Sequence, residues 1–423
     1  MSIRNKLIIA FIPLLMSAES TVAQYANTSN GQSPSGLTAA LQAVIANNPS
    51  IKGKEAELRA QGYNLDTVKA SRYPSMSVTA NNISEQYDNQ GTVRLDQPIY
   101  AFGKINARID EAEAGYNVEL WDLLRVQRQL VEEAAVAYSQ IEGLLRRSQI
   151  ARQNIEEHEE LYERIERRQL GQLASEADVT IANSRLVQSR SSLERIQGEY
   201  QVALAELRAL TLVNIPVQDP VDARFAMLPA EQNLQELALE ESAELGLRRE
   251  EIERVRREVD REKVDYLPTV YLRAEYDFLD QRLNTDPGRI GVALESDLDG
   301  FGFASRGRIK GAAARLDAAD QQLSVSREEI RRQVSVLYAN KVTQENLVRS
   351  QKAAIEASEA TLASFIRQYE TGRKSWVDVL NTQRELTNLR FELAEFETNL
   401  MIYSVRLQAL TGGLDQMAGI ESL

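Results

Sequence analysis

The chain has 423 residues, no cysteine and one histidine, and its 62 Asp and Glu outnumber its 49 Lys and Arg, giving a formal net charge of −13. The absence of cysteine excludes disulfides, thiolate metal sites, cysteine nucleophiles and a lipid-acceptor cysteine. The acidic balance argues against a nucleic-acid partner, because phosphates require a basic surface. The ten prolines leave two long proline-free stretches, 99–215 and 288–423. Since a proline inside a helix costs about 3 kcal/mol, these stretches allow very long helices.

The first 23 residues predict a secretory signal peptide. Arg4 and Lys6 precede an apolar run at 7–16, and small residues follow up to Ala23, after which we expect cleavage. The alternative is a membrane anchor or a buried helix, but ten apolar residues interrupted by Pro13 are shorter than the roughly 20 that span a bilayer. We expect 24–36 to form a flexible N-terminal segment.

The rest of the chain reads as a duplication with an offset near 200 residues. Three segments match later segments in the same order: 72–80 with 266–274, 101–103 with 300–302, and 207–211 with 407–411. A period this long indicates a duplicated unit, because solenoid repeats run about 20–50 residues. We therefore predict a first structural repeat at 37–212, a proline-rich linker at 213–230, a second repeat at 231–412 and a C-terminal tail at 413–423.

Four segments of alternating polar and apolar residues predict strands. They lie at about 74–83 and 92–100 in the first repeat, and at about 268–278 and 289–298 in the second. Their length and alternation suit tilted strands that cross a bilayer; the alternative is a half-buried sheet of a soluble protein. Four strands leave open edges, which lipid does not tolerate. Two chains would supply eight strands with a filled interior, and three would supply twelve with a wider bore.

Each pair of strands is followed by a predicted hairpin of two long helices. The hairpins cover about 104–211 and 303–411, with their tips near 171 and 372, and their apolar residues step by three and four as in a coiled coil. Gly171 and Gly372 stand where a chain reversal needs positive φ. Ser175 and Ser375 are placed to cap the returning helices.

Three motifs give the chain a resemblance to a known family. They are Asp96-Gln-Pro-Ile-Tyr-Ala-Phe-Gly103, the string Tyr369-Glu-Thr-Gly-Arg-Lys-Ser-Trp-Val-Asp-Val-Leu380, and Leu407-Gln-Ala-Leu-Thr-Gly412. With the duplicated helix–strand–strand–helix–helix plan, they resemble the TolC family of outer-membrane channel-tunnels over essentially all of the mature sequence. The resemblance implies a mainly α fold with a small membrane β part. In this fold, the long antiparallel coiled-coil hairpins of a homotrimer form an α-barrel, which is continuous with a 12-stranded β-barrel.

The same resemblance implies a function, a location and partners. The protein would be the exit duct of a tripartite export machine in the bacterial outer membrane, extending into the periplasm and contacting outer-membrane lipid. It would work with a periplasmic adaptor (membrane fusion protein) and an inner-membrane ABC or RND pump. The missing acylated cysteine favours the non-lipidated branch that serves type I protein secretion. Alternatives are multidrug efflux as the main role, or a periplasmic coiled-coil adaptor or structural protein without a channel.

The resemblance also assigns candidate residues at the second tip. Tyr369, Lys374, Asp378 and Asn381 match positions that line the closed periplasmic entrance. Lys374 replaces the family's common arginine, and Asn381 stands where a second acid is often found. An alternative for Asp378 is a purely structural role, since a carboxylate in the first turn favours the helix dipole. The tips differ in spacing, because Asp378 lies six residues after Gly372 but Asp178 lies seven after Gly171.

No enzyme site or cofactor is expected. His158 lies in the acidic string Glu156-Glu-His-Glu-Glu160, without a second histidine. It therefore predicts a solvated helix face rather than a metal site. The sequence offers no convincing catalytic nucleophile, acid–base pair or metal set.

Overall fold

The computed structural model describes residues 36–83, 88–217, 220–221, 223–278, 287–296 and 302–421. The predicted signal peptide and residues 24–35 lie outside the described residues. All of the helices and strands named below belong to one compact unit, Ser35–Leu423.

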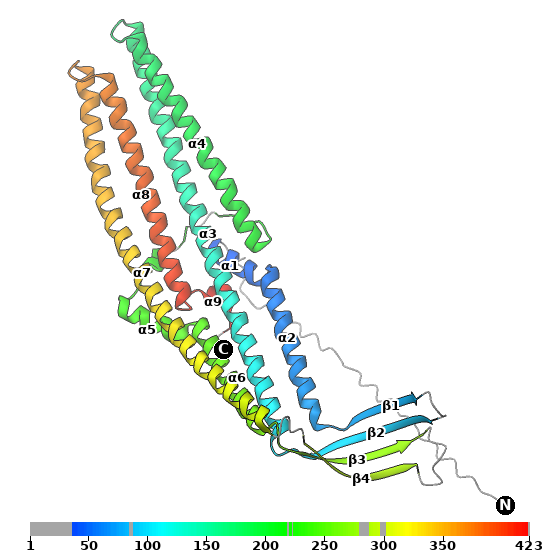
Figure 1. Cartoon of the computed structure of the whole chain (residues 1–423). Helices are drawn as coiled ribbons and strands as arrows, with labels where there is room; N and C mark the ends of the chain where they lie inside the picture. Colours follow the sequence, from blue (N-terminus) through cyan, green and yellow to red (C-terminus); the bar gives the residue numbers. More distant parts are fainter. Residues whose placement is uncertain are drawn as a thin grey trace, which may run out of the picture. The chain divides into compact units, whose positions relative to one another are not determined.

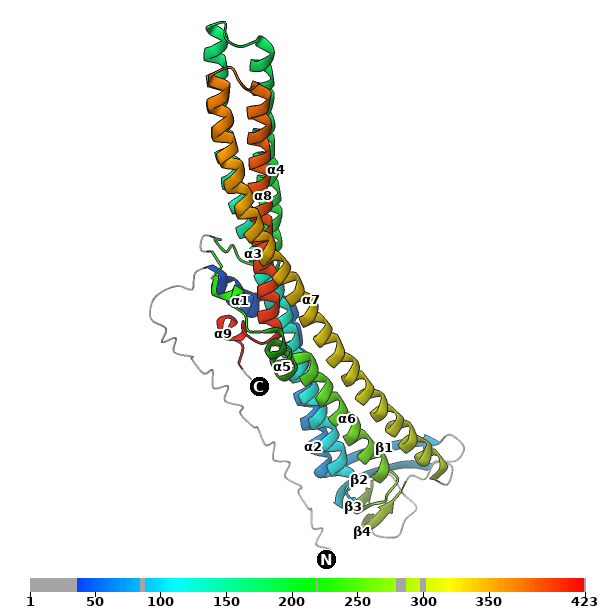
Figure 2. The ribbon, with the colours of Figure 1, turned by 90° about the vertical axis from the view of Figure 1, so that its left-hand side faces the viewer.

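Two antiparallel hairpins of long helices dominate this unit (Figure 1). Helices α3 (Lys104–Leu170) and α4 (Glu176–Thr211) form the first, and α7 (Phe303–Glu370) and α8 (Trp376–Leu410) form the second. The hairpins lie side by side, with α3 packed on α8 (Figure 2). The 67 residues of α3 span about 100 Å at 1.5 Å per residue.

Shorter helices support the long ones. Helices α1 (Gly36–Asn47) and α2 (Pro49–Lys69) pack on α3, α5 (Glu231–Glu241) packs on α7, and α6 (Ala243–Val264) lies between α3 and α7. Asn48 separates α1 from α2 by accepting a hydrogen bond from the Ser50 amide at 2.9 Å, with Pro49 in the first turn. The linker and the tail, where the sequence indicated no helix, contain the short 3₁₀ helix η2 (Ala223–Ala226) and α9 (Asp415–Ala418).

The largest apolar core surrounds the middle of α3. Fully buried Tyr138 and Ile141 pack with side chains of α1, α4, α8, α9 and the linker, and each buried side chain of this size contributes roughly 1.5–3 kcal/mol. The two repeats approach closely here, because a Cβ on Gly143 of α3 would lie 2.2 Å from Thr398 Oγ1 of α8. This core joins the two repeats.

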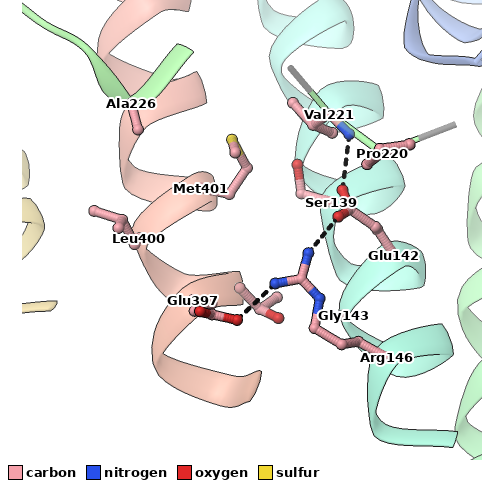
Figure 3. A pocket seen from close by; sticks show the side chains of 11 residues that line it. Ser139, Glu142, Gly143, Arg146, Pro220, Val221, Ala226, Glu397, Leu400 and Met401 are labelled. Atoms are coloured by element: carbon pink, nitrogen blue, oxygen red, sulfur yellow. Dashed lines mark hydrogen bonds and ion pairs between the residues drawn. The ribbon is translucent and has the colours of Figure 1, made fainter. Parts of the chain in front are cut away.

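A cavity of about 390 Å³ lies beside this joint, between α3, α8 and the linker (Figure 3). Glu142 accepts hydrogen bonds from Arg146 at 2.7 Å and from the Val221 amide at 2.9 Å. Arg146 also donates to Glu397 at 2.7 Å. The charged groups of the lining therefore bind one another and fix the linker to α3.

The four strands form one antiparallel sheet in chain order (Figure 1). They are β1 (Ser75–Ile83), β2 (Asp88–Tyr100), β3 (Thr269–Asp277) and β4 (Gly288–Glu295). Strand β2 begins four residues before its predicted start because it pairs with the whole of β1, up to Ile83 opposite Asp88. Strand β4 ends at Glu295, and positions 297–298 of the predicted strand lie outside the described residues.

The two faces of the sheet differ in character. One face carries exposed apolar side chains, which are Met76, Val78, Leu95, Leu272, Tyr276, Ile290, Val292 and Leu294. On the other face, charges pair across the strands: Arg94 with Glu275 at 2.8 Å, Arg273 with Asp96 at 2.6 Å and Arg289 with Asp277 at 2.8 Å. Within the described part of the chain, no helix has an apolar stretch long enough to cross a membrane.

The expectation for His158 is wrong. Its side chain is 5% exposed, inside the helix packing rather than on a solvated face. Its Nδ1 has no hydrogen-bond partner among the described residues, and burial lowers the pKa of the imidazole, because a buried site disfavours the charged form. Among the described residues no group of His, Cys, Asp and Glu is arranged to hold a metal ion.

Candidate functional site

The candidate site is the pair of hairpin tips, which share one turn geometry. The left-handed residue is Gln172 in the first tip, with φ 59°, and Gly372 in the second, with φ 73°. The amide of the next residue closes the helix end in both: Leu173 donates to the Arg168 carbonyl at 2.8 Å, and Arg373 donates to the Gln368 carbonyl at 2.9 Å. These are the 6→1 bonds of a helix end with a left-handed residue.

The expected positive φ at Gly171 is therefore wrong. Gly171 has φ −83° and ends α3, while the adjacent Gln172 takes the left-handed conformation. With Gln172 as the counterpart of Gly372, Asp178 and Asp378 both follow six residues later. The apparent difference between the tips came from aligning two glycines that occupy different positions in the turn.

Both returning helices begin with the same capping box. Ser175 and Ser375 each accept a hydrogen bond from the amide of the aspartate three residues later, at 3.1 Å. Asp178 and Asp378 accept in return from the serine amides, at 3.1 and 3.2 Å. Each box satisfies donors that a helix start otherwise leaves unpaired. The bonds from Ser375 lower the pKa of Asp378, so this carboxylate has a structural role that Asp178 shares.

Tyr369 packs inside the tip region and not on its surface. Its side chain is 8% exposed and belongs to an apolar cluster with Leu161 and Ile165 of α3 and Trp376 of α8. The ring centroids of Tyr369 and Trp376 lie 5.1 Å apart. The Arg168 guanidinium lies 4.7 Å from the Tyr369 ring centroid, and burial raises the pKa of the Tyr369 hydroxyl.

We call the contacts of Arg164, Arg168, Tyr369 and Glu370 the inter-hairpin latch. Arg164 of α3 pairs with Glu370 of α7 at 3.1 Å, and Arg168 covers the Tyr369 ring. A cation over an aromatic ring contributes about 0.5–1 kcal/mol at an exposed site, and an exposed ion pair about 0.2–1 kcal/mol. The latch therefore holds the two hairpins together at their ends.

The other candidate residues lie around the second turn. The Lys374 ammonium lies 4.2 Å from the Phe365 ring centroid, and Asn381 is exposed on the first turns of α8. The structure thus gathers all four candidates at one tip, with Tyr369 inward, Lys374 over an aromatic ring and Asp378 in the cap.

Sequence reasoning missed Arg168 and Trp376 as tip residues. Trp376 stands within the tip motif, but its burial against Tyr369 depends on how α7 and α8 pack. The partner of Arg168 lies about 200 positions away in the sequence. Only the offset of the internal duplication could have suggested that the ends of α3 and α7 meet.

Comparison with known proteins decides the family. A family model described as "Outer membrane efflux protein" matches residues 40–211 and 234–413, which is most of the chain. The chain belongs to the outer membrane efflux protein family. The family model matches the chain in two separate ranges, with residues 212–233 between them.

The named relatives have low sequence identity to this chain, but the similarity covers most of both proteins. The alkaline protease secretion protein AprF of Pseudomonas aeruginosa is 21% identical over 387 residues, covering 86% of this chain and 78% of AprF. The outer membrane efflux protein BepC of Brucella suis biovar 1 is 21% identical over 400 residues, covering 89% and 85%. The outer membrane protein VceC of Vibrio cholerae superposes with a TM-score of 0.73 at 18% identity, covering 89% and 96%, and this likeness shows the fold.

Family membership confirms the resemblance to the TolC-like channel-tunnels and the predicted location. This outer membrane efflux protein lies in the bacterial outer membrane and extends into the periplasm, and its role is that of an export channel. The mainly α fold with a small antiparallel sheet is also confirmed.

If the latch holds the hairpins together, removing it should make both tips more mobile. In the double variant Arg164→Gln/Arg168→Gln, we expect amide hydrogen exchange in 161–182 and 362–380 to become about 3–30-fold faster. This range corresponds to a loss of about 0.7–2 kcal/mol of contact energy. Exchange followed by mass spectrometry measures the change segment by segment.

The matched control is Arg152→Gln/Arg167→Gln, which also removes two cations from α3. Arg167 pairs with Glu163 of its own helix, and Arg152 forms no ion pair with a described residue. The control should leave exchange at the tip of the second hairpin unchanged. Equal exchange in both double variants would show that the latch contacts do not hold the hairpins.

Proposed function

We propose that three copies of this chain form one duct that receives cargo in the periplasm and releases it outside the outer membrane. In this assembly the three sheets close a twelve-stranded barrel in the lipid, and the helical hairpins form the periplasmic tunnel. A periplasmic adaptor and an inner-membrane ABC or RND pump deliver the cargo. The protein acts as a conduit and catalyses no reaction.

This proposal rests on two properties of the four-stranded sheet, which are its open edges and the different character of its two faces. Strands β1 and β4 each pair on one side only among the described residues, and the exposed apolar face suits lipid while the ion-paired face suits water. An unpaired edge in hydrocarbon leaves backbone groups unsatisfied, at several kcal/mol each. Joining β4 of one copy to β1 of the next removes every edge, and twelve strands leave an open bore.

The hairpin tips form the entrance in this proposal. Three copies of Asp378, with Lys374 and Asn381 nearby, would surround the axis at the periplasmic end. The shared capping box explains why Asp178 and Asp378 are both in place. In Asp378 both bonds from Ser375 go to Oδ2, so Oδ1 takes no part in the cap. That oxygen is the group we assign to cation binding at the entrance, and the latch holds the tips in the closed arrangement.

Replacing Asp378 tests the entrance role. We expect Asp378→Ala to raise single-channel conductance in planar bilayers and to weaken block by divalent cations at least about tenfold, because three carboxylates leave the constriction. The matched control is Asp178→Ala, which removes an equivalent capping box worth about 1 kcal/mol. Identical conductance and block in both variants would contradict a role of Asp378 beyond the cap.

The cargo we propose is a secreted protein, as in type I secretion. AprF is named for alkaline protease secretion, and the chain carries no cysteine that could be acylated. BepC, named as an efflux protein, is equally similar at 21% identity, so drug efflux is the second candidate. Both roles use the same duct, because a passive channel leaves the choice of cargo to its pump.

Deleting the gene separates the two roles. We expect the culture medium to lose at least one secreted protein, with sensitivity to lipophilic drugs changed less than twofold, and a plasmid copy to restore secretion. Mass spectrometry of the medium and growth-inhibition assays measure these outcomes. An unchanged set of secreted proteins with a large gain in drug sensitivity would instead make efflux the main role.

A further inference from the structure

We propose that the helix–strand junctions form a collar that binds anionic phospholipid headgroups at the periplasmic surface of the membrane. The collar consists of exposed aromatic residues and of exposed basic residues that form no ion pair with a described residue. This inference rests on the membrane-spanning role proposed for the sheet, and it adds a lipid class to it. The residues are Lys69, Arg72, Tyr73, Tyr100, Phe102, Tyr266, Phe303, Arg306 and Lys310.

Aromatic side chains mark every passage between the helices and the sheet. Tyr73 precedes β1, Tyr100 ends β2 with Phe102 just before α3, Tyr266 precedes β3, and Phe303 begins α7. All of these side chains are between 37% and 78% exposed. The ends of α2, α3, α6 and α7 gather beside the sheet (Figure 1). Aromatic residues at this level are typical of the boundary between hydrocarbon and headgroups.

A bulge in β2 turns one of these rings toward the apolar face. The register shifts between Pro98 and Tyr100, so that Tyr100 lies opposite Val270. Val270 shares its face of β3 with Leu272, which is apolar and exposed. Without the extra residue, Tyr100 would follow Asp96 and Pro98 on the ion-paired face. A β-bulge can redirect a side chain from one face of a sheet to the other. Here it adds an aromatic ring to the face that we assign to lipid.

Four basic residues at the same junctions have no acidic partner in the described part of the chain. Lys69, Arg72, Arg306 and Lys310 are exposed, and none forms an ion pair with a carboxylate of the described residues. Other cations nearby are paired: Lys104 and Arg108 lie 3.7 and 2.8 Å from Asp265, and Arg261 lies 2.6 Å from Glu111. The chain as a whole has a net charge of −13, so four cations without a carboxylate partner among the described residues make the junctions locally basic.

Cation and aromatic rings meet in one hollow of the surface. A cavity of about 240 Å³ is lined by Arg72, Tyr100, Phe102 and Asn106, among others. Arg72 donates from Nη2 to Asn106 Oδ1 at 3.0 Å, which holds the guanidinium beside the rings. The Tyr100 and Phe102 rings pack edge to face at 4.6 Å. A guanidinium binds phosphate strongly, and the rings suit the glycerol and the first acyl carbons of a lipid.

Charge complementarity selects the anionic lipids. A zwitterionic headgroup carries its own cation and gains little from four further positive charges, whereas phosphatidylglycerol has a net negative charge. Basic residues beside an anionic membrane surface each strengthen binding about fivefold, and salt weakens this attraction. We therefore expect selective retention of phosphatidylglycerol over phosphatidylethanolamine.

The test compares two quadruple variants of the full mature protein. The collar variant is Lys69→Gln/Arg72→Gln/Arg306→Gln/Lys310→Gln. Its matched control is Lys52→Gln/Arg59→Gln/Arg327→Gln/Arg349→Gln, which removes four exposed cations from α2 and α7 farther from the sheet, none of them in an ion pair with a described residue. Native mass spectrometry of detergent-solubilised protein titrated with each lipid counts the bound molecules.

Wild type and control should bind phosphatidylglycerol more tightly than phosphatidylethanolamine, and the collar variant should lose at least about tenfold in affinity for phosphatidylglycerol only. Equal phosphatidylglycerol binding by the collar variant and wild type would overturn the proposal, as would an equal loss in the control.

A second measurement needs wild type alone: raising NaCl from about 0.05 to about 0.5 M should weaken phosphatidylglycerol binding, and no change would also overturn the proposal. Cross-linking of collar residues to a neighbouring copy or an adaptor would assign the surface to protein contact instead. In each of these outcomes bilayer conductance persists, whereas failure of the duct itself abolishes it.

Discussion

Backbone N–H and C=O groups at the two edges of the sheet need hydrogen-bond partners, and the described part of the chain supplies none beside β1 or β4. In water such an edge is solvated, but in hydrocarbon each unpaired group costs several kcal/mol. The exposed apolar face of the same strands favours lipid, so burying the face requires closing the edges. A single chain cannot satisfy both demands, and the proposed trimer resolves this conflict.

The two helical hairpins are joined to each other at a few places along their length. Each repeat contributes two strands and one helical hairpin, and the two hairpins join at the core around Tyr138 and again at the tips. Between these points polar bridges such as Glu157 with Arg390, at 2.8 Å, cross from α3 to α8. The strongest apolar joint is therefore in the middle, and the tips depend on a small cluster and the latch. The tips are therefore joined by fewer buried apolar side chains than the middle.

The sequence alone predicted the architecture closely, because its signals are local or periodic. Alternation located the strands, the three-and-four spacing located the long helices, and the serine caps at 175 and 375 located the returning helices. The features that it could not predict depend on tertiary packing or fine backbone geometry. Gly171 was expected to take the left-handed conformation, yet it is the C-cap of α3 with φ −83°, and the next residue, Gln172, is the left-handed one. His158 lies among acidic neighbours in the sequence, but the packing of the helices buries it. Tyr369 was matched to the entrance by resemblance, while its burial under Arg168 comes from a contact across the two repeats.

The central claim is that β1 of one copy pairs with β4 of the next, and disulfide cross-linking tests it directly because the chain has no native cysteine. Ser77→Cys or Thr79→Cys on β1 would be combined with Gly291→Cys or Ala293→Cys on β4, since all four positions lie on the ion-paired face. Paired antiparallel strands hold opposite Cα atoms at about 4.5–5.5 Å, which suits a disulfide. After oxidation in isolated outer membranes, we predict covalent trimers from at least one combination. These trimers should revert to monomers on reduction, and the single-cysteine variants should not form them. Monomers alone from all four combinations, in protein that still reaches the outer membrane, would contradict the account.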